Sequence, residues 1–310
     1  MKKLLAGIVL LLTPISLRAE YFELGVDQTS GSNGYSGTSG YAQLASDKGL
    51  YFKPRFNIMQ TNQSSTKYGS YFARVGYDQF GFIGDEQLLH LGLEGGGTPV
   101  ANGYGNASAS ADMTVSLIGG KAGAVLAGPG SRGEKGRYGV GLTRVDVGLM
   151  GTLIEHREDA PAATPATHVG QADWGAFAGV NLLSLQGSVQ VMKSSYQRAI
   201  PTYTAFQPNL ELVGVSNMVS GFPDLSYNIK VQTNELILFS PFVSYTYTTF
   251  NQYKTGANLS ASHAMQFGVS ANLAMLELRG SYQYYDPGRG YATRNYISLG
   301  ASLNFGAAGS

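Results

Sequence analysis

The stretch RNYISLGASLNF, residues 294–305, changes character at every second position. Its apolar set is Ile297, Leu299, Ala301, Leu303 and Phe305, and its other set is Arg294, Tyr296, Ser298, Gly300, Ser302 and Asn304. Side chains of a β-strand point alternately to its two faces, so this stretch predicts a strand with one apolar and one mostly polar face. Such a strand can lie between an apolar phase on one side and water on the other.

The same alternation recurs along the chain, in residues 21–27, 50–59, 68–77, 171–181 and 276–284. A half-buried sheet of a soluble protein could alternate in this way. A transmembrane barrel, however, requires segments of about ten residues whose apolar side chains face outward and whose polar side chains face inward. The length of the segments therefore favours a membrane barrel.

The first residues predict export. Lys2 and Lys3 precede an apolar run at residues 4–12, and a small residue, Ala19, offers a cleavage site, as in a secretory signal peptide. We therefore predict a cleaved leader at residues 1–19, a barrel at residues 20–305 and a short tail at residues 306–310. Export of a chain with such strands points to the bacterial outer membrane.

Composition excludes several classes of protein. Removal of Lys2, Lys3 and Arg18 with the leader lowers the 21 basic residues to 18, against 20 acidic ones, so the mature chain has a formal charge near −2 and no nucleic-acid footprint. After the leader, polar residues interrupt every apolar run before it could cross a bilayer as a helix. The sequence holds no cysteine, which excludes disulfides, thiolate metal sites and a lipid-modified cysteine.

The connections between strands predict their number, because outer-membrane barrels join strands by short periplasmic turns and longer external loops. We expect short turns at residues 46–49, 84–87, 119–121, 142–145, 181–184, 233–235 and 271–275, and long loops at residues 29–38, 61–66, 96–107, 128–136, 156–168, 196–224, 251–257 and 286–291. This alternation predicts an all-β, antiparallel, up-and-down transmembrane barrel of about sixteen strands.

One hairpin of that count has an alternative. Between residues 137 and 153 the apolar face switches from even to odd positions, which indicates either a turn or a one-residue bulge. We interpret it as a turn, because otherwise short turns and long loops would no longer alternate along the chain. If it and residues 119–121 are both bulges, the barrel has fourteen strands, and twelve is the smallest count considered.

With its leader, its alternating strands and a last strand that ends at Phe305, the sequence resembles porin-like Gram-negative outer-membrane β-barrel proteins. The resemblance covers residues 20–305 and matches no narrower subfamily. It implies outer-membrane lipid as surroundings, recognition of the last strand at Phe305 by the barrel-assembly machinery, and a homotrimer as one arrangement. Residues 306–310 depart from the pattern, since many members of the class stop at the aromatic residue. Tyr282, Tyr284, Tyr285 and Tyr296 predict an aromatic girdle at the headgroups.

Charged residues on the polar face predict a pore wall: Lys53, Arg55, Arg74, Glu94, Asp173, Lys230, Glu277, Arg279 and Arg294. The functional hypothesis is passive diffusion of small polar solutes through a charged, water-filled lumen. The alternative is a closed lumen in which these charges pair with one another, in a surface adhesin or structural barrel. Strand number decides between them, because eight strands leave a filled interior and sixteen an aqueous channel.

The longest loop, residues 196–224, is too apolar to be an ordinary exposed loop. We expect it to fold back and constrict the lumen, with Arg198, Glu211 and Asp224 as its charged residues. A hydrophobic extension of the strands above the membrane, or a contact with a neighbouring subunit, is the equally weighted alternative.

An outer-membrane hydrolase is the further alternative, because His156 and His168 bracket a loop with two carboxylates. That loop is rich in Ala, Pro and Thr, so we interpret both histidines as solvated loop residues and predict no catalytic residue, metal site or cofactor. His90 is expected to face inward and to hydrogen-bond Glu94. The Gly-rich stretch at residues 128–136 has a lysine, Lys135, but no Ser or Thr follows it, and the strand-to-helix context of a phosphate loop is missing.

Overall fold

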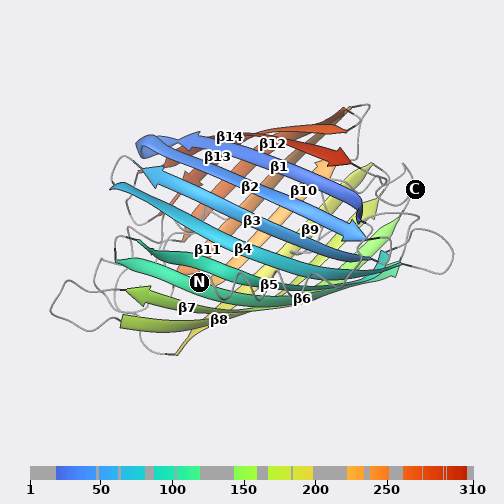
Figure 1. Cartoon of the computed structure of the whole chain (residues 1–310). Coiled ribbons are helices and arrows are strands. Elements are labelled where there is room, and N and C mark those ends of the chain that lie inside the picture. The colour runs from blue at the N-terminus through green and yellow to red at the C-terminus, as the bar shows by residue number, and fades with distance from the viewer. Residues whose placement is uncertain are drawn as a thin grey trace.

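The computed structural model describes residues 19–46, 49–61, 64–80, 87–101, 103–118, 143–158, 167–182, 184–197, 222–233, 238–250, 261–273, 275–288, 290 and 292–305. They form one closed barrel of fourteen antiparallel strands, in which each strand pairs with the next along the chain (Figure 1). The strands are β1 (Ala19–Gly31), β2 (Tyr35–Ser46), β3 (Leu50–Thr61), β4 (Ser64–Phe80), β5 (Gln87–Ala101), β6 (Tyr104–Ile118), β7 (Arg144–Glu158), β8 (Thr167–Leu182), β9 (Leu185–Tyr196), β10 (Pro223–Thr233), β11 (Phe239–Phe250), β12 (Ser262–Leu273), β13 (Leu276–Asp286) and β14 (Arg294–Phe305). Among these residues, no helix is long and apolar enough to cross a bilayer.

The last strand closes the barrel against the first. β14 pairs with β1 from Phe22 opposite Phe305 to Gly31 opposite Tyr296, so every edge of the sheet is paired. The bounds of β14 are those predicted from its alternation. An even number of strands places the start of β1 and the end of β14 at the same end of the barrel.

The expected count of sixteen strands is wrong, and the alternative of fourteen is confirmed. β6 pairs directly with β7, from Tyr104 opposite Glu158 to Ile118 opposite Val145. The described barrel therefore closes without the two extra strands that were expected between residues 119 and 145. Residues 119–142 lie outside the described part of the chain.

Several expected external loops are strand instead. β1 and β2 are joined only by the 3-10 turn η1 (Ser32–Gly34), where Asn33 and Gly34 have positive φ, as a tight hairpin turn requires. β3 and β4 are joined by residues 62–63, and β5 and β6 by residues 102–103. Backbone pairing thus continues beyond the apolar band, where polar composition hides the strand from an analysis of hydrophobic alternation.

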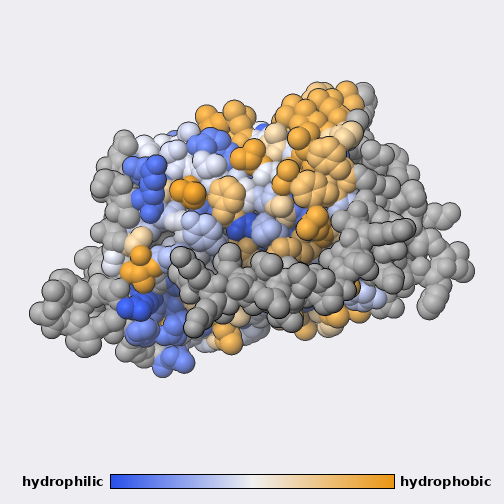
Figure 2. Space-filling view, in the orientation of Figure 1, coloured by the Kyte–Doolittle hydropathy of each residue, from blue (hydrophilic) through white to orange (hydrophobic). Residues whose placement is uncertain are grey.

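The two faces of the wall differ as the alternation predicts. Outward side chains are large, apolar and exposed, such as Leu93, Trp174 and Leu299, each about 60% exposed. Inward positions carry most of the buried polar and charged residues. Figure 2 shows apolar side chains over the outer surface and hydrophilic ones at the end that carries the β1–β2 turn. An apolar outer surface of this extent is stable only against another apolar phase, so the fold is that of a transmembrane β-barrel.

Candidate functional site

The inner wall is the candidate functional site, and all nine residues predicted for it lie in strands. Directly opposite residues of antiparallel strands share a face, so Lys53, Arg74 and Glu94, which are opposite one another on β3, β4 and β5, point to the same side. The side chain next to Arg74, Val75, is on the exposed apolar side, which places the three charges inside. By the same alternation the others face inward: Arg55 on β3, Asp173 on β8, Lys230 on β10, Glu277 and Arg279 on β13, and Arg294 on β14.

Arg55 and Glu94 form a two-pronged ion pair across β4. Arg55 Nη2 donates to Glu94 Oε1 at 2.7 Å, and its Nε donates to Oε2 at 3.1 Å. The Arg55 side chain is 42% exposed and that of Glu94 is 17% exposed. This pair therefore presents charge to solvent on the inner wall.

Arg74 lies in a buried polar network that joins four strands. Its Nε donates to the Tyr51 hydroxyl at 2.7 Å, and its Nη2 donates to Asp112 Oδ1 at 2.6 Å. His90 Nε2 lies 3.1 Å from Arg74 Nη2, and His90 Nδ1 lies 2.5 Å from Asp78 Oδ1. All five side chains are buried. Because a buried charge is stable only when it is paired, this network ties β3, β4, β5 and β6 together.

Gly92 makes room for the network. A Cβ atom there would lie 2.0 Å from Arg74 Nη2 and 2.8 Å from Asp112 Oδ1. Any side chain at residue 92 would thus collide with the Arg74–Asp112 pair.

Other inward charges pair in the same manner. Arg144 Nε donates to both Asp146 carboxylate oxygens at 2.9 Å, and both residues are buried. Arg279 Nη2 donates to both oxygens of Asp27, at 3.1 and 3.2 Å, and its Nη1 lies 3.6 Å from the carboxylate of buried Glu277. Part of the wall's charge is therefore neutralised within the wall.

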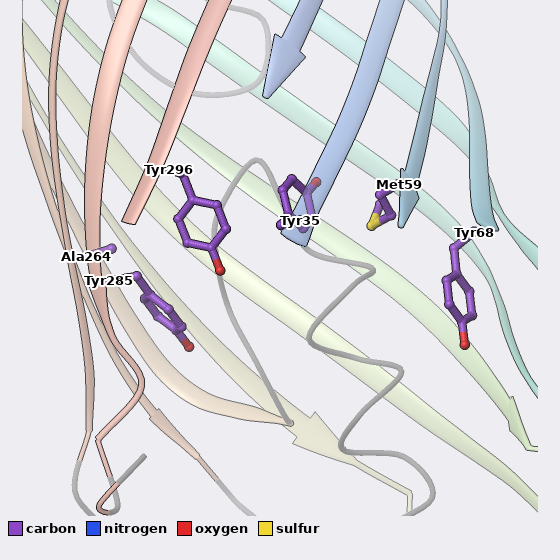
Figure 3. Close-up of a cluster of buried hydrophobic side chains, with 6 residues drawn as sticks. All are labelled: Tyr35, Met59, Tyr68, Ala264, Tyr285 and Tyr296. Atoms are coloured by element: carbon purple, nitrogen blue, oxygen red, sulfur yellow. The ribbon is translucent and has the colours of Figure 1, made fainter. Parts of the chain in front are cut away.

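Tyrosines line the inside of the barrel near one end (Figure 3). Tyr35, Tyr68, Tyr285 and Tyr296 are buried and cluster with Met59, and the rings of Tyr35 and Tyr296 meet edge to face at 5.4 Å. Tyr35 begins β2 directly after η1, so the cluster lies at the end of the barrel opposite the start of β1 and the end of β14. The prediction that Tyr285 and Tyr296 belong to a lipid-facing girdle is wrong, whereas Tyr282 and Tyr284 do face outward and are exposed.

The residues predicted for the constriction loop divide into two groups. Arg198 and Glu211 lie outside the described residues. Asp224 lies not in a loop but at the second residue of β10, where its Oδ1 accepts a hydrogen bond from Lys193 Nζ of β9 at 2.7 Å.

His156 and His168, the two histidines of the hydrolase alternative, do not form a pair. The expectation that His156 and His168 are loop residues is wrong, since they lie in β7 and β8. His156 is buried, with its Nε2 2.8 Å from Gln171 Oε1, whereas His168 is exposed beside Glu155. Alternation places the two rings on opposite faces of the wall.

His90 faces inward as expected, but its carboxylate partner is Asp78 rather than Glu94. Four residues along a strand span about 13 Å, so Glu94 is out of reach, whereas Asp78 lies directly opposite on β4. Sequence reasoning did not single out Asp78, Arg144 and Asp146, and their inward positions were the available signal. Among the described residues, no group of three or more His, Asp or Glu side chains could hold a metal ion.

Comparison with known proteins gives structural similarity only. No family model matches the sequence, and a search of curated proteins finds no relative. Among solved structures, CdiB from Acinetobacter baumannii aligns with 93% of this chain at 11% identity and a TM-score of 0.49, and the chain spans 60% of CdiB. The outer membrane protein OpdK from Pseudomonas aeruginosa aligns over 93% of this chain and 99% of its own, at 9% identity and a TM-score of 0.44. The NanC porin aligns over 90% and 98%, at 10% identity and a TM-score of 0.43. All three scores are below 0.5, so the barrel assignment rests on this chain's own strand pairing and on its two unlike faces.

Proposed function

We propose that the protein is a porin-like channel of the bacterial outer membrane, through which small polar solutes diffuse passively. The observation that carries this proposal is a closed ring of fourteen strands with an apolar outer face and a polar, charged inner face. The interior of a β-barrel widens with strand number, from filled at eight strands to an aqueous channel at sixteen to eighteen. A barrel of fourteen strands is closer in width to the barrels that hold an aqueous channel than to those with a filled interior.

The chemistry of the inner wall supports a hydrated lumen. Inward positions on β10, β11 and β12 carry hydroxyl and amide groups that bond to one another across strands: Ser226 with Thr248 at 3.0 Å, Asn228 with Thr246 at 2.8 Å, and Gln266 on β12 with Ser281 on β13 at 3.1 Å. Such groups hydrogen-bond readily to water and to polar solutes.

A barrel with a closed lumen, acting as an adhesin or a structural protein, is the second candidate. The buried ion pairs favour it, since Arg74, Asp112, Arg144 and Asp146 satisfy one another inside the wall rather than meeting solvent. Accessible Arg55 favours the channel.

Electrical recording from the purified protein in a planar bilayer separates the two candidates. The channel predicts stepwise conductance that grows with salt concentration. A membrane that stays silent after insertion, with the protein shown to be folded by heat-dependent migration on electrophoresis, would establish the closed barrel instead.

We further propose that residues 197–222, which connect β9 to β10, narrow the passage. Deletion of residues 207–217 is then expected to raise the single-channel conductance, because part of the constriction is removed while both strands remain. Equal conductance before and after the deletion would show that this segment lies outside the ion path. Deletion of residues 254–257, in the connection between β11 and β12, is the matched control.

A further inference from the structure

The inner face of β9–β12 carries almost no charge. A single charged residue, Lys230, is found at the inward positions of residues 186–194, 226–232, 240–248 and 262–272. Its ammonium group lies 4.8 Å from the centroid of the Phe242 ring and makes a further interaction, so the wall itself holds this cation. Most of the other inward positions on these strands carry Ser, Thr, Asn or Gln.

Six of these uncharged side chains form a continuous patch, which we call the neutral panel: Ser188, Gln190, Asn228, Ser244, Thr246 and Gln266. In the register, Asn228 is directly opposite both Gln190 and Thr246, and Ser244 is directly opposite Gln266. Side chains opposite one another in this way lie about 5 Å apart. All six are partly exposed, so water in the lumen reaches them.

The amides of the neutral panel keep free capacity for hydrogen bonds. Asn228 Nδ2 donates to Thr246 Oγ1 at 2.8 Å, and Gln266 Nε2 donates to Ser281 Oγ at 3.1 Å. An amide has two N–H donors and an oxygen with two lone pairs, so these bonds use only part of what each side chain offers. Asn228 and Gln266 can therefore both donate to and accept from a solute.

The wall that faces the neutral panel is charged, but its charges are compensated. In the closed ring of fourteen strands, β9–β12 lie across the lumen from β2–β5 (Figure 1). On that side both carboxylate oxygens of Glu94 bind Arg55, and Arg74 is bound to Asp112 of β6. Lys53 likewise has partners in the protein. An ionic solute would have to displace such a partner to form an ion pair, and the displaced charge would be left without compensation.

We propose that the neutral panel is the surface of the lumen that solutes contact, and that the preferred solutes are uncharged polyhydroxylated molecules of the class of sugars and polyols. The inference rests on the proposed channel function and adds the class of solute to it. A solute hydroxyl both donates and accepts hydrogen bonds, as the amides and hydroxyls of the panel do. A charged solute loses more hydration free energy than a polyol when it leaves bulk water, and the compensated charges of the wall do not offset that loss.

Uptake of labelled solutes into vesicles that contain the protein tests the solute class. Sorbitol, gluconate and glucamine share one polyhydroxylated carbon chain and are neutral, anionic and cationic at neutral pH. At equal concentrations below saturation and in the same salt, we expect sorbitol to enter at least about threefold faster than either ion, because it is the least costly of the three to dehydrate.

Replacement of two amides tests the role of the neutral panel. The double variant Asn228→Leu, Gln266→Met removes both amides and nearly keeps the side-chain volumes. We expect it to lower the sorbitol-to-gluconate uptake ratio by about threefold or more, because hydrogen bonds to the polyol are lost. Gln28→Leu is the matched control, since it removes an amide from an exposed position of β1 opposite outward-facing Leu299 and should leave the ratio unchanged.

Gln266→Glu tests whether the neutral panel faces the solute path, because it adds a charge with almost no change of size. A carboxylate a few Å from the path should attract the cation, so we expect the glucamine-to-sorbitol uptake ratio to rise by about threefold or more. An unchanged ratio would place Gln266 away from the path and would overturn the role of the panel.

The outcomes separate the two proposals. If none of the three solutes enters through the folded, unmodified protein, the channel is overturned and the inference with it. Equal uptake of all three, or faster uptake of an ion, would leave the channel standing and overturn the solute class. A preference for sorbitol that is unchanged in the double variant would show that other groups set it, and would overturn the role of the neutral panel.

Discussion

Replacement of Arg74 by leucine is expected to lower the free energy of unfolding by about 3–5 kcal/mol. The substitution removes the arginine that binds buried Asp112 and donates to Tyr51, and it leaves the carboxylate with His90, whose Nε2 lies 3.4 Å from Asp112 Oδ2, in a site from which solvent is excluded. Urea unfolding of the protein in lipid vesicles measures the change, with the fluorescence of the single tryptophan, lipid-facing Trp174, as the signal.

Arg55→Leu is the control for this prediction. It breaks the ion pair with Glu94, which also joins an arginine to a carboxylate on the inner wall. The Arg55 side chain is 42% exposed, so we expect the free energy of unfolding to fall by no more than about 1 kcal/mol. Equal losses in the two variants would show that the Arg74 network is solvated rather than buried.

Replacement of Leu299 by arginine is expected to destabilise the protein in the bilayer by about 2–4 kcal/mol, the cost of a cation on the lipid face near the midplane. Leu299 lies in the middle of β14, and its outward side chain is 65% exposed. The loss should appear as a lower folded yield in vesicles and a lower urea midpoint.

The neighbouring variant Ser298→Arg places the same cation on the inner face. It removes the 2.7 Å hydrogen bond between Ser298 and Thr29, so we expect a destabilisation of about 1 kcal/mol, smaller than that of Leu299→Arg. If the inward arginine were as costly as the outward one, the assignment of the two faces would be wrong.

The faces of the strands could be predicted from sequence because alternation is a local property. Arg74 and Val75 are neighbours in the chain, and their difference in polarity was enough to place one inside and the other outside. The number of strands, in contrast, could not be predicted from a local property of the sequence. It depends on whether β6 meets β7 or an intervening hairpin, and the switch of apolar parity after residue 137 is compatible with either.

Which charged side chains of the inner wall are accessible to solvent could be learned only from the structure. Arg55 and Arg74 share a face, and sequence gives no reason to treat them differently. One is accessible beside Glu94, and the other is buried above Gly92 among Tyr51, His90 and Asp112. That contrast arises from residues opposite one another in the register, which can be read only after the strands are paired.

Accessibility of single cysteines distinguishes a wetted inner face from a lipid-covered outer face. The chain has no cysteine, so each variant carries one thiol only. Ser188→Cys and Ser244→Cys place it on inward positions of β9 and β11, and Val189→Cys and Val243→Cys place it on their exposed, outward neighbours.

With the protein in lipid vesicles, a charged, membrane-impermeant thiosulfonate reagent should label both inward cysteines and leave both outward ones unmodified until detergent is added. Labelling of the outward pair in the bilayer, or protection of the inward pair, would contradict the water-filled barrel.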